Sequence, residues 1–286
     1  MEHDQRCHDC LLSRVSLEIE LGKKKDRINQ DILKHADLLI RFLHTTPWTH
    51  PMVASALHRW VYRELGVSDP FYALKETSRI DSLRVLKTVS DTLAGFRERV
   101  LASIIGNMFD YGVKGHEVSD DFLSFFRKEY ASGLAIDDTR EILPLCQDVL
   151  YFTDNCGEIV FDRFLISWLK ENNCRVTVVL RDKPILNDAT LEDAYNLGLD
   201  TLADNVLSSG SGVEIGVRFD LLSEEVLTAM DRCSLIISKG MANYESLREE
   251  EGLPPVAYLL AAKCDPIAEE FGVRRGDKIA SLRRPR

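Results

Sequence analysis

A chain of 286 residues is long enough to bury one large hydrophobic core or two smaller ones, and its 45% hydrophobic and 29% charged content is ordinary for a globular protein. The net charge of −10 argues against a general nucleic-acid-binding protein. No apolar run approaches the roughly 20 residues that span a bilayer, and the polar N-terminus has no signal-peptide core. We therefore expect a cytoplasmic protein that binds neither nucleic acid nor a membrane.

The seven cysteines are odd in number and scattered, which suits reduced thiols rather than a disulfide framework. Cys174 and Cys233 lie at the edges of expected strands and are predicted to fill the core. Cys7 and Cys10 form a Cys-x-x-Cys motif. A structural zinc site normally needs four ligands, and the sequence has no second such motif. We therefore favour a structural or redox-sensitive pair over metal binding.

From about residue 8 to 135 the apolar residues recur at helical spacing, with no convincing strand. Pro47 follows the end of one expected helix, and Gly66 ends the next. Ser68-Asp69-Pro70 is a helix start signal with proline just inside the helix. Gly95 interrupts the pattern, and a further helix is expected from Arg97 to Phe109. The first half of the chain is therefore predicted to be helical.

After residue 137 the pattern changes to alternating strands and helices. The expected strands are Val149–Phe152, Arg175–Leu180, Asn205–Leu207, Leu235–Ile237 and Val256–Leu260. The expected helices are Glu158–Glu171, Leu191–Asn196, Leu222–Arg232 and Asn243–Glu250. Such alternation indicates a mostly parallel sheet covered on both faces. The predicted fold class is α/β, with a helical N-terminal domain (1–136) and a Rossmann-like three-layer α/β/α domain (137–286). The basic segment from Arg274 to Arg286 is expected to be a solvated tail.

Asp154 and Asn155 follow the first strong strand candidate, directly before a helix. In open α/β sheets, ligands bind at the carboxyl ends of the strands. Two adjacent oxygen side chains favour a hard cation such as Mg²⁺ or Mn²⁺. The alternative is that Asp154 caps the helix and Asn155 fills a turn. This segment alone does not separate the two interpretations.

Asp188 follows the next strand and lies just before a predicted helix, so capping is again an alternative. Neighbouring strand–helix units place their loops side by side. Asp154, Asn155 and Asp188 could then supply three oxygens to one cation and leave the other positions to water or substrate.

Two later strand ends carry cations. Lys239 and Gly240 place an ammonium group and a freely turning backbone beside the expected crevice. Asn243 could cap the following helix or bind a ligand, and Glu245 could serve a cap or a proton relay. Lys263, at the fifth strand end, could contact a phosphate oxygen. A single such lysine is usually only solvated, but two in these loops make an anion site more plausible than either alone.

Asn107 and Asp110 share a helix face near the end of the helical region. They could form one wall of a cleft, or merely mark a helix end and the turn after it. The sequence has no P-loop, no Gly-x-Gly-x-x-Gly after its first strand and no Gly-x-Ser-x-Gly elbow. P-loop, dinucleotide-binding and serine-hydrolase chemistry are therefore not supported.

Four short motifs together resemble the DUF89 family, the damage-control phosphatase (ARMT1-like) family of metal-dependent phosphatases. They are Phe152-Thr-Asp-Asn-Cys-Gly-Glu158, Leu186-Asn-Asp-Ala-Thr190, Ser238-Lys-Gly-Met-Ala-Asn-Tyr-Glu245 and Ala262-Lys-Cys-Asp265. The N-terminal Cys7-His-Asp-Cys10 resembles the prokaryotic-type branch of that family. The resemblance covers nearly the whole chain.

The resemblance implies a helical N-terminal region, a Rossmann-like α/β/α region and a divalent metal, typically Mg²⁺, Mn²⁺, Co²⁺ or Ni²⁺. The family's metal-binding positions fall on Asp154, Asn155 and Asp188, its substrate contacts on Asn243 and Tyr244 with the branch-specific Glu245, and its phosphate-contacting lysine on Lys263. Lys239, Gly240 and Asn107 are inferred from position in the chain rather than from the resemblance.

We therefore expect a metal-dependent phosphatase that hydrolyses phosphate monoesters of small metabolites, such as sugar phosphates or phosphopantetheine-like compounds, in metabolite damage control. Direct attack by water is favoured over an aspartyl-phosphate on Asp154, which is the leading metal ligand. One alternative is an S-adenosylmethionine-dependent carboxyl methyltransferase, against which the missing Gly-rich loop argues. Another is a non-catalytic metabolite- or metal-binding protein with Cys7 and Cys10 as a redox handle. The substrate, the preferred metal and the oligomeric state do not follow from the sequence.

Overall fold

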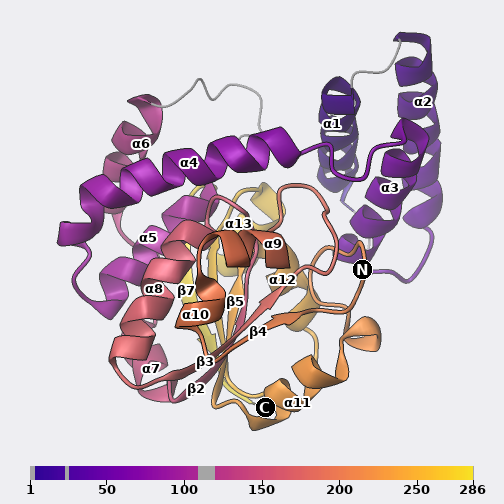
Figure 1. Cartoon of the computed structure of the whole chain (residues 1–286). Helices are drawn as coiled ribbons and strands as arrows, with labels where there is room; N and C mark the ends of the chain where they lie inside the picture. The colour runs from indigo at the N-terminus through magenta and orange to yellow at the C-terminus, as the bar shows by residue number, and fades with distance from the viewer. Residues whose placement is uncertain (1–3, 23–25, 109–119, 286) are drawn as a thin grey trace.

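The computed structural model describes residues 4–22, 26–108 and 120–285, and its first part is helical (Figure 1). The helices before the sheet are α1 (Gln5–Gly22), α2 (Asp26–Leu43), α3 (His50–Leu65), α4 (Tyr72–Val89), η1 (Ser90–Thr92), α5 (Phe96–Met108) and α6 (Asp120–Ser132). As the sequence predicts, α3 ends at Gly66, whose left-handed backbone (φ 64°) suits glycine. Within the described ranges, no helix is both long and apolar enough to cross a bilayer.

The second part of the chain alternates strands and helices. Its strands are β1 (Ile136–Asp137), β2 (Asp148–Phe152), β3 (Arg175–Leu180), β4 (Asn205–Ser208), β5 (Leu235–Lys239), β6 (Val256–Ala261) and β7 (Lys278–Arg283). Its helices are α7 (Thr139–Ile142), η2 (Leu143–Leu145), α8 (Ile159–Glu171), α9 (Leu191–Asn196), α10 (Leu199–Leu202), η3 (Phe219–Leu221), α11 (Glu224–Arg232), α12 (Gly240–Leu247) and α13 (Asp265–Phe271). The predicted α/β class is confirmed.

The strands form one mostly parallel sheet in the order β1-β7-β6-β5-β2-β3-β4. Strands β2 to β6 pair in parallel, whereas β7 is antiparallel to β6. From β2 the chain adds β3 and β4 on one side and then β5 and β6 on the other. The order therefore reverses between β2 and β5, and this switch point is where open α/β sheets bind ligands.

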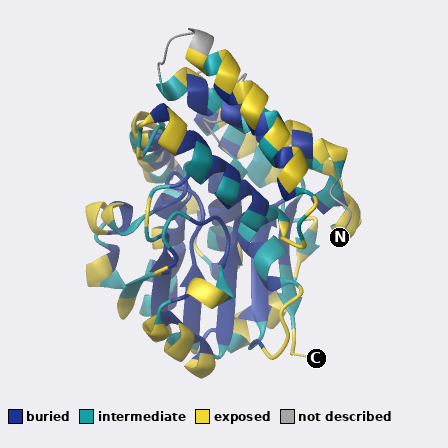
Figure 2. Ribbon diagram, turned by 90° about the vertical axis from the view of Figure 1, so that its right-hand side faces the viewer, coloured by how far each residue is buried: buried dark blue, intermediate teal, exposed yellow. Residues whose placement is uncertain are grey.

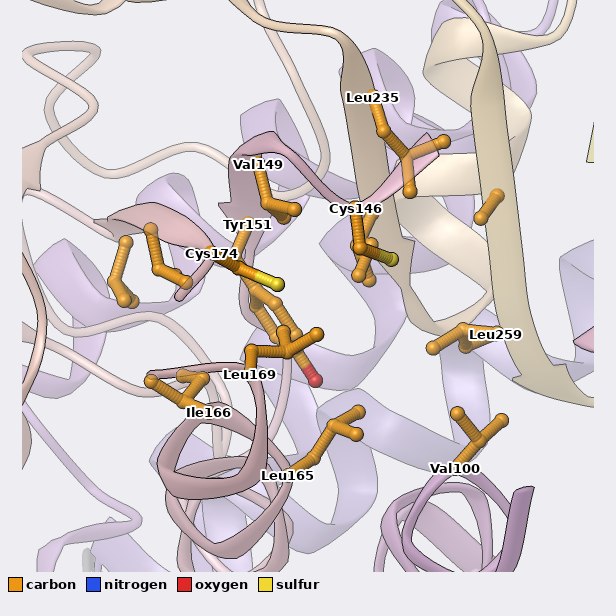
Figure 3. Close-up of a cluster of buried hydrophobic side chains, with 14 of the residues drawn as sticks. Val100, Cys146, Val149, Tyr151, Leu165, Ile166, Leu169, Cys174, Leu235 and Leu259 are labelled. Carbon is orange, nitrogen blue, oxygen red and sulfur yellow. The ribbon is translucent and has the colours of Figure 1, made fainter. Parts of the chain in front are cut away.

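The period-two alternation of the strands divides the core into two layers. Val149 and Tyr151 of β2 pack with α5 and α8 on one face, as Figure 3 shows for part of this cluster. Leu150 and Phe152 pack with α11, α12 and α13 on the other face. The central strands β2, β3, β5 and β6 are accordingly almost wholly buried, and the middle of the sheet is dark blue in Figure 2. Cys174 and Cys233 are buried in these layers, as predicted.

A third core lies within the bundle of α1, α2 and α3. Two loops from the carboxyl edge of the sheet insert residues into it: Ile185 from the β3–α9 loop and Ile215 from the segment before α11. Helix α4 then runs from this bundle across the top of the molecule towards α6 (Figure 1). The helical part therefore holds the loops at the ligand-binding edge of the sheet.

The division of the chain into 1–136 and 137–286 stays a prediction. In the structure, residues 136 and 137 together form β1, which pairs with β7. Helix α5, which precedes the division, packs directly on the sheet, because Phe96, Val100 and Ile104 share a cluster with the strand residues. The helical and α/β parts therefore share a hydrophobic core.

The expectation of a solvated basic tail is wrong for Lys278–Arg283, which forms β7. Its backbone pairs with β6 along the whole strand, and Ile279 and Ala280 are fully buried. The Lys278 ammonium is also buried and lies 2.6 Å from a carboxylate oxygen of Glu129. The sequence analysis missed this strand because basic residues surround it. Its pairing with β6 is not visible in the local sequence. Helix α12 also begins three residues before the predicted start at Asn243.

Candidate functional site

The loops that follow β2 and β3 pair with each other through their backbones. The Ala189 amide donates to the Asp154 carbonyl at 2.7 Å, and the Cys156 amide donates to the Asn187 carbonyl at 2.8 Å. Between these bonds, Asn155 and Asp188 form an antiparallel bridge. The sequence predicts that Asp154, Asn155 and Asp188 lie close together, and this backbone pairing places their segments side by side.

The two aspartates do not cap helices, so the capping alternative is wrong. Glu158 precedes the first residue of α8, and no side chain caps that helix. Thr190 caps α9 in a capping box with Asp193, whose carboxylate accepts the Thr190 amide at 2.8 Å. The carboxylates of Asp154 and Asp188 therefore have other partners.

Arg181 forms ion pairs with both carboxylates, and the sequence analysis missed it. Its Nε donates to Asp188 Oδ2 at 2.6 Å, and its Nη2 lies 3.7 Å from Asp154 Oδ1. The same Nη2 donates to Asn243 Oδ1 at 3.0 Å. The guanidinium is buried, and its planar fork suits this simultaneous contact with several oxygens. The available signal was a charged residue directly after a buried strand.

Asp188 is held in an environment that disfavours its charge. Burial raises the pKa of the Asp188 carboxyl to about 6, Arg181 opposes this rise, and the nearby Asp154 adds to it. A second positive charge near Asp154 and Asp188 would therefore be stabilising.

Asn107, at the end of α5, contacts the site directly. Its Nδ2 donates to Asp154 Oδ2 at 2.8 Å and to Glu158 Oε2 at 2.7 Å. Its Oδ1 is buried and has no hydrogen-bond partner among the residues that the structure describes. The sequence analysis placed Asn107 on a cleft wall but did not single out Glu158. Asp110, its proposed companion, lies outside the described residues.

Lys239 is fully buried, and it points towards α8 rather than towards a free phosphate position. Its ammonium forms ion pairs with Glu158 and Asp162, the latter at 2.7 Å, and lies 3.3 Å from the Ser103 carbonyl. Burial raises the pKa of Glu158 to about 8, while Lys239 acts in the opposite direction. A contact between Lys239 and phosphate would require this network to break, and the predicted phosphate role of Lys239 stays a prediction.

Gly240 lies between β5 and α12 and touches the Asp154 carboxylate. Its backbone is left-handed (φ 75°), and a Cβ added there would lie 2.0 Å from Asp154 Oδ2. A side chain at this position would therefore displace the carboxylate as well as strain the backbone. Glycine is required here for close approach across the switch point.

Asn243 links the two strands that carry the site to the guanidinium of Arg181. Its Nδ2 donates to the backbone carbonyls of Thr153, at 3.0 Å, and Lys239, at 2.8 Å, while its Oδ1 accepts from Arg181. The buried amide thus ties the end of β2 to β5 and orients the guanidinium. Because both ends of its amide are engaged, the contacts support a positioning role, and its predicted substrate contact stays a prediction.

Tyr244, Glu245 and Lys263 lie on the β5–β6 side of the site. The Tyr244 hydroxyl donates to Glu270 at 2.6 Å, and its ring packs edge-on against Tyr258, so it faces α13. Burial raises the pKa of Glu245 to about 7. Lys263 is half-buried just after β6. Their predicted substrate and phosphate contacts stay predictions.

The residues around Asp154 fit a hard divalent cation. Carboxylate and amide oxygens are the donors that Mg²⁺ and Mn²⁺ prefer. The Asn107 Oδ1, which has no partner within the described ranges, is an additional buried oxygen. In the parts of the chain that the structure describes, no group of three His, Cys, Asp or Glu side chains is arranged to hold a metal ion. A cation would therefore use Asp154 and Asp188 together with amide oxygens and water.

Comparisons with known proteins agree over the whole chain. A family model for the damage-control phosphatase ARMT1-like domain matches residues 3–279. A damage-control phosphatase from Archaeoglobus fulgidus is 39% identical over 283 residues, which cover 96% of this chain and 97% of that protein. Damage-control phosphatase PH1575 from Pyrococcus horikoshii is 31% identical over 285 residues, with 96% of each chain covered. The crystal structure of the DUF89 family protein PH1575 has a TM-score of 0.89 at 29% identity and covers 98% of both chains.

Proposed function

Because this chain belongs to the damage-control phosphatase ARMT1-like family, we propose that it is a divalent-metal-dependent phosphatase acting on phosphate monoesters of small metabolites. Family membership supports a phosphatase in metabolite damage control. The metal dependence and the substrate class, sugar phosphates or phosphopantetheine-like compounds, are the new parts of the proposal.

The observation that carries the proposal is the backbone pairing of residues 154–156 with 187–189. It brings the backbone segments that carry Asp154, Asn155 and Asp188 side by side at the switch point of the sheet, which supports a shared role for their oxygen side chains. Carboxylates brought together in this way repel one another unless a cation balances them. Arg181 supplies part of that balance, and a divalent ion would supply the rest.

A divalent ion held by Asp154, Asn155 and Asp188 would polarise a phosphoryl oxygen and lower the pKa of bound water. Arg181 fixes the orientation of the two carboxylates, and Asn107 holds Asp154 from the opposite side. Lys263 is the proposed contact for an equatorial phosphate oxygen. Both oxygens of Asp154 face donors, Asn107 and Arg181. This arrangement favours attack by water over a phosphorylated Asp154.

The proposal is tested by measuring phosphate release from a panel of sugar phosphates and 4′-phosphopantetheine with Mg²⁺, Mn²⁺, Co²⁺ or Ni²⁺. We expect EDTA to abolish turnover and added metal to restore it. Asp154→Asn should lower kcat/KM by at least about 10²-fold, because it removes the charged ligand that would hold the cation, and the cation balances the charge of the reacting phosphate. Asp231→Asn, at an exposed position of α11, is the matched control and should retain full activity. Turnover that persists in EDTA, or in Asp154→Asn, would contradict the proposal.

A further inference from the structure

The first half of α4 has a buried polar face. Lys75, Ser78 and Ser82 are spaced by three and four residues, share one side of the helix and are all buried. Further along, Val85 and Val89 continue the buried side with apolar residues that pack into a hydrophobic cluster with α5 and α6. Burying polar side chains is costly unless they have partners or a function, so this change along one helix needs an explanation.

The polar face of α4 lies against the loop between β2 and α8. A Cβ added to Gly157 would lie 2.0 Å from Ser78 Oγ and 3.4 Å from Ser82 Oγ. The Cys156 thiol lies 3.8 Å from the backbone carbonyl of Lys75. Figure 1 shows α4 crossing above the α/β part at this end of the molecule. Helix α4 therefore covers the segment that begins with Asp154.

Lys75 is the cation on this face, and it is only 4% exposed. Its ammonium pairs with Asp69 Oδ2 at 2.7 Å, and the Asp69 side chain retains 14% exposure. The backbone carbonyl of Lys75 contacts the Cys156 thiol, two residues after Asp154. A buried cation from the helical part thus lies beside the segment that carries Asp154 and Asn155.

Lys75 differs from Lys239 in the number of partners around its ammonium group. Lys239 has two carboxylates and a carbonyl around its ammonium. For Lys75, Asp69 is the ion-pair partner among the described residues. An ammonium group carries three N–H donors, so Lys75 retains donors for an incoming anion.

A cavity of about 830 Å³ lies beside the segments that lead to these groups. It is bordered by Gly66, Val67 and Ser68, which directly precede Asp69, and by Lys183 and Pro184 of the loop that leads to Asp188. The chain segments that approach Asp69 and Asp188 therefore meet at one hollow.

We propose that Lys75 is a substrate-binding residue of this phosphatase, whose ammonium binds a phosphoryl oxygen of a substrate placed against Asp154 and Asp188. This inference rests on the proposed function and adds a contact from the helical part. In it, Asp69 holds the ammonium in place, and the free N–H donors of Lys75 contact the phosphate. The sequence analysis placed Asp69 only in a helix start signal and gave Lys75 no role, because the role of both residues depends on how α4 packs over the sheet.

Three variants test this assignment: Lys75→Met, Asp69→Asn and the control Lys87→Met, which changes an exposed lysine of the same helix. Because a hydrogen bond to a charged group is worth about 1.5–3 kcal/mol, Lys75→Met should raise both KM and the inhibition constant of inorganic phosphate by about 10- to 100-fold. Asp69→Asn keeps the oxygen that accepts the Phe71 amide at 3.0 Å. It frees the ammonium, so phosphate should inhibit this variant at least as strongly as it inhibits the wild type.

A purely structural ion pair predicts a different pattern. Lys75→Met and Asp69→Asn would then lose stability together in urea unfolding, and their inhibition by phosphate would change equally or not at all. Either result would overturn the assignment, as would a Lys75→Met enzyme with wild-type KM and inhibition constant. Lys87→Met should match the wild type in every measurement.

Calorimetric titration of inorganic phosphate in the presence of Mg²⁺ separates this inference from the proposed function. If the wild type hydrolyses the panel and Lys75→Met binds phosphate normally, the inference fails and the function stands. If the wild type hydrolyses nothing but binds phosphate through Lys75, the function fails and the contact stands. If the wild type neither hydrolyses the panel nor binds phosphate, both fail.

Discussion

Two buried cations lie on either side of β2, and they do different things. Lys239, at the end of β5, is 0% exposed and pairs with two acids of α8 and its N-terminus, Glu158 and Asp162, which are also 0% exposed. Arg181, just after β3, pairs with Asp154 and Asp188, whose side chains are 11% and 6% exposed. Lys239 belongs to a fully buried network, whereas Arg181 contacts two carboxylates that keep a small exposed fraction.

The comparison shows that a cation at a strand end does not by itself indicate phosphate binding. The ammonium of Lys239 is a point charge that several surrounding oxygens satisfy completely, so it anchors α8 to β5. The fork of Arg181 orients two carboxylates and leaves their other lone pairs free for a ligand. The side chains that surround each cation determine its role, and those come from distant parts of the chain.

The largest effect on stability should come from Lys239→Met. It leaves Glu158 and Asp162 buried without a cation, and removing one partner of a buried ion pair typically costs about 3–5 kcal/mol. Urea unfolding measures this loss. The loss of stability should be greater at pH 8 than at pH 6, because protonation at the lower pH neutralises Glu158 and Asp162. Lys170→Met removes a partly exposed lysine from its pair with Asp204 and, as the control, should cost about 1 kcal/mol or less. Equal losses of stability in Lys239→Met and Lys170→Met would contradict this prediction.

Arg181→Met should destabilise the protein less, by about 2 kcal/mol, because Asp154 and Asp188 can be hydrated or bind a cation. Its main effect should be on the pH dependence of kcat/KM. Burial raises the pKa of Asp188 to about 6 from an ordinary value near 4. The folded protein therefore binds this proton more tightly than the unfolded chain, so the contribution of Asp188 to stability falls as pH rises from about 4 to 6.

Stability falls as pH rises from about 4 to 6, but activity that needs the ionised Asp188 carboxylate rises over the same range. Arg181 lowers the pKa of Asp188, so its removal should move the acidic limb of the kcat/KM profile above pH 6. If the acidic limb of the kcat/KM profile were unchanged in Arg181→Met, Arg181 would not control the ionisation of Asp188. The exposed Arg232, at the end of α11, provides the control Arg232→Met, for which no shift is expected.

The sequence predicts those parts of the site that depend on local pattern and on parallel topology. The buried run of β2 stops at Thr153, so Asp154 and Asn155 had to lie at its carboxyl end. Asp188 follows the adjacent strand, and parallel units present such loops at one edge. The resemblance to the DUF89 family is confirmed by the family match and by the fold. The predicted metal and substrate roles of these residues stay predictions.

The remaining features depend on contacts that no local pattern contains. Arg181 is positioned by Asn243 and by the Gly216 carbonyl, which follow it by 62 and 35 residues. Strand β7 forms only because β6 offers it an edge. Lys75 reaches the site because α4 packs over Gly157. In each case the local sequence fits more than one role, and tertiary packing selects one of them.

The smallest expected effect on stability comes from two glycines between β5 and β6, on the Lys239 side of β2. Gly240 and Gly252 have nearly the same left-handed backbone (φ 75° and 74°), but only at Gly240 would a Cβ meet Asp154, whereas at Gly252 it would meet nothing within 4 Å. Alanine at either position should cost about 1 kcal/mol of backbone strain. Gly240→Ala should in addition displace the Asp154 carboxylate and lower kcat/KM by about 10²-fold. Gly252→Ala should be fully active. If the two alanine variants were equally active, the closeness of Gly240 to Asp154 would have no part in catalysis.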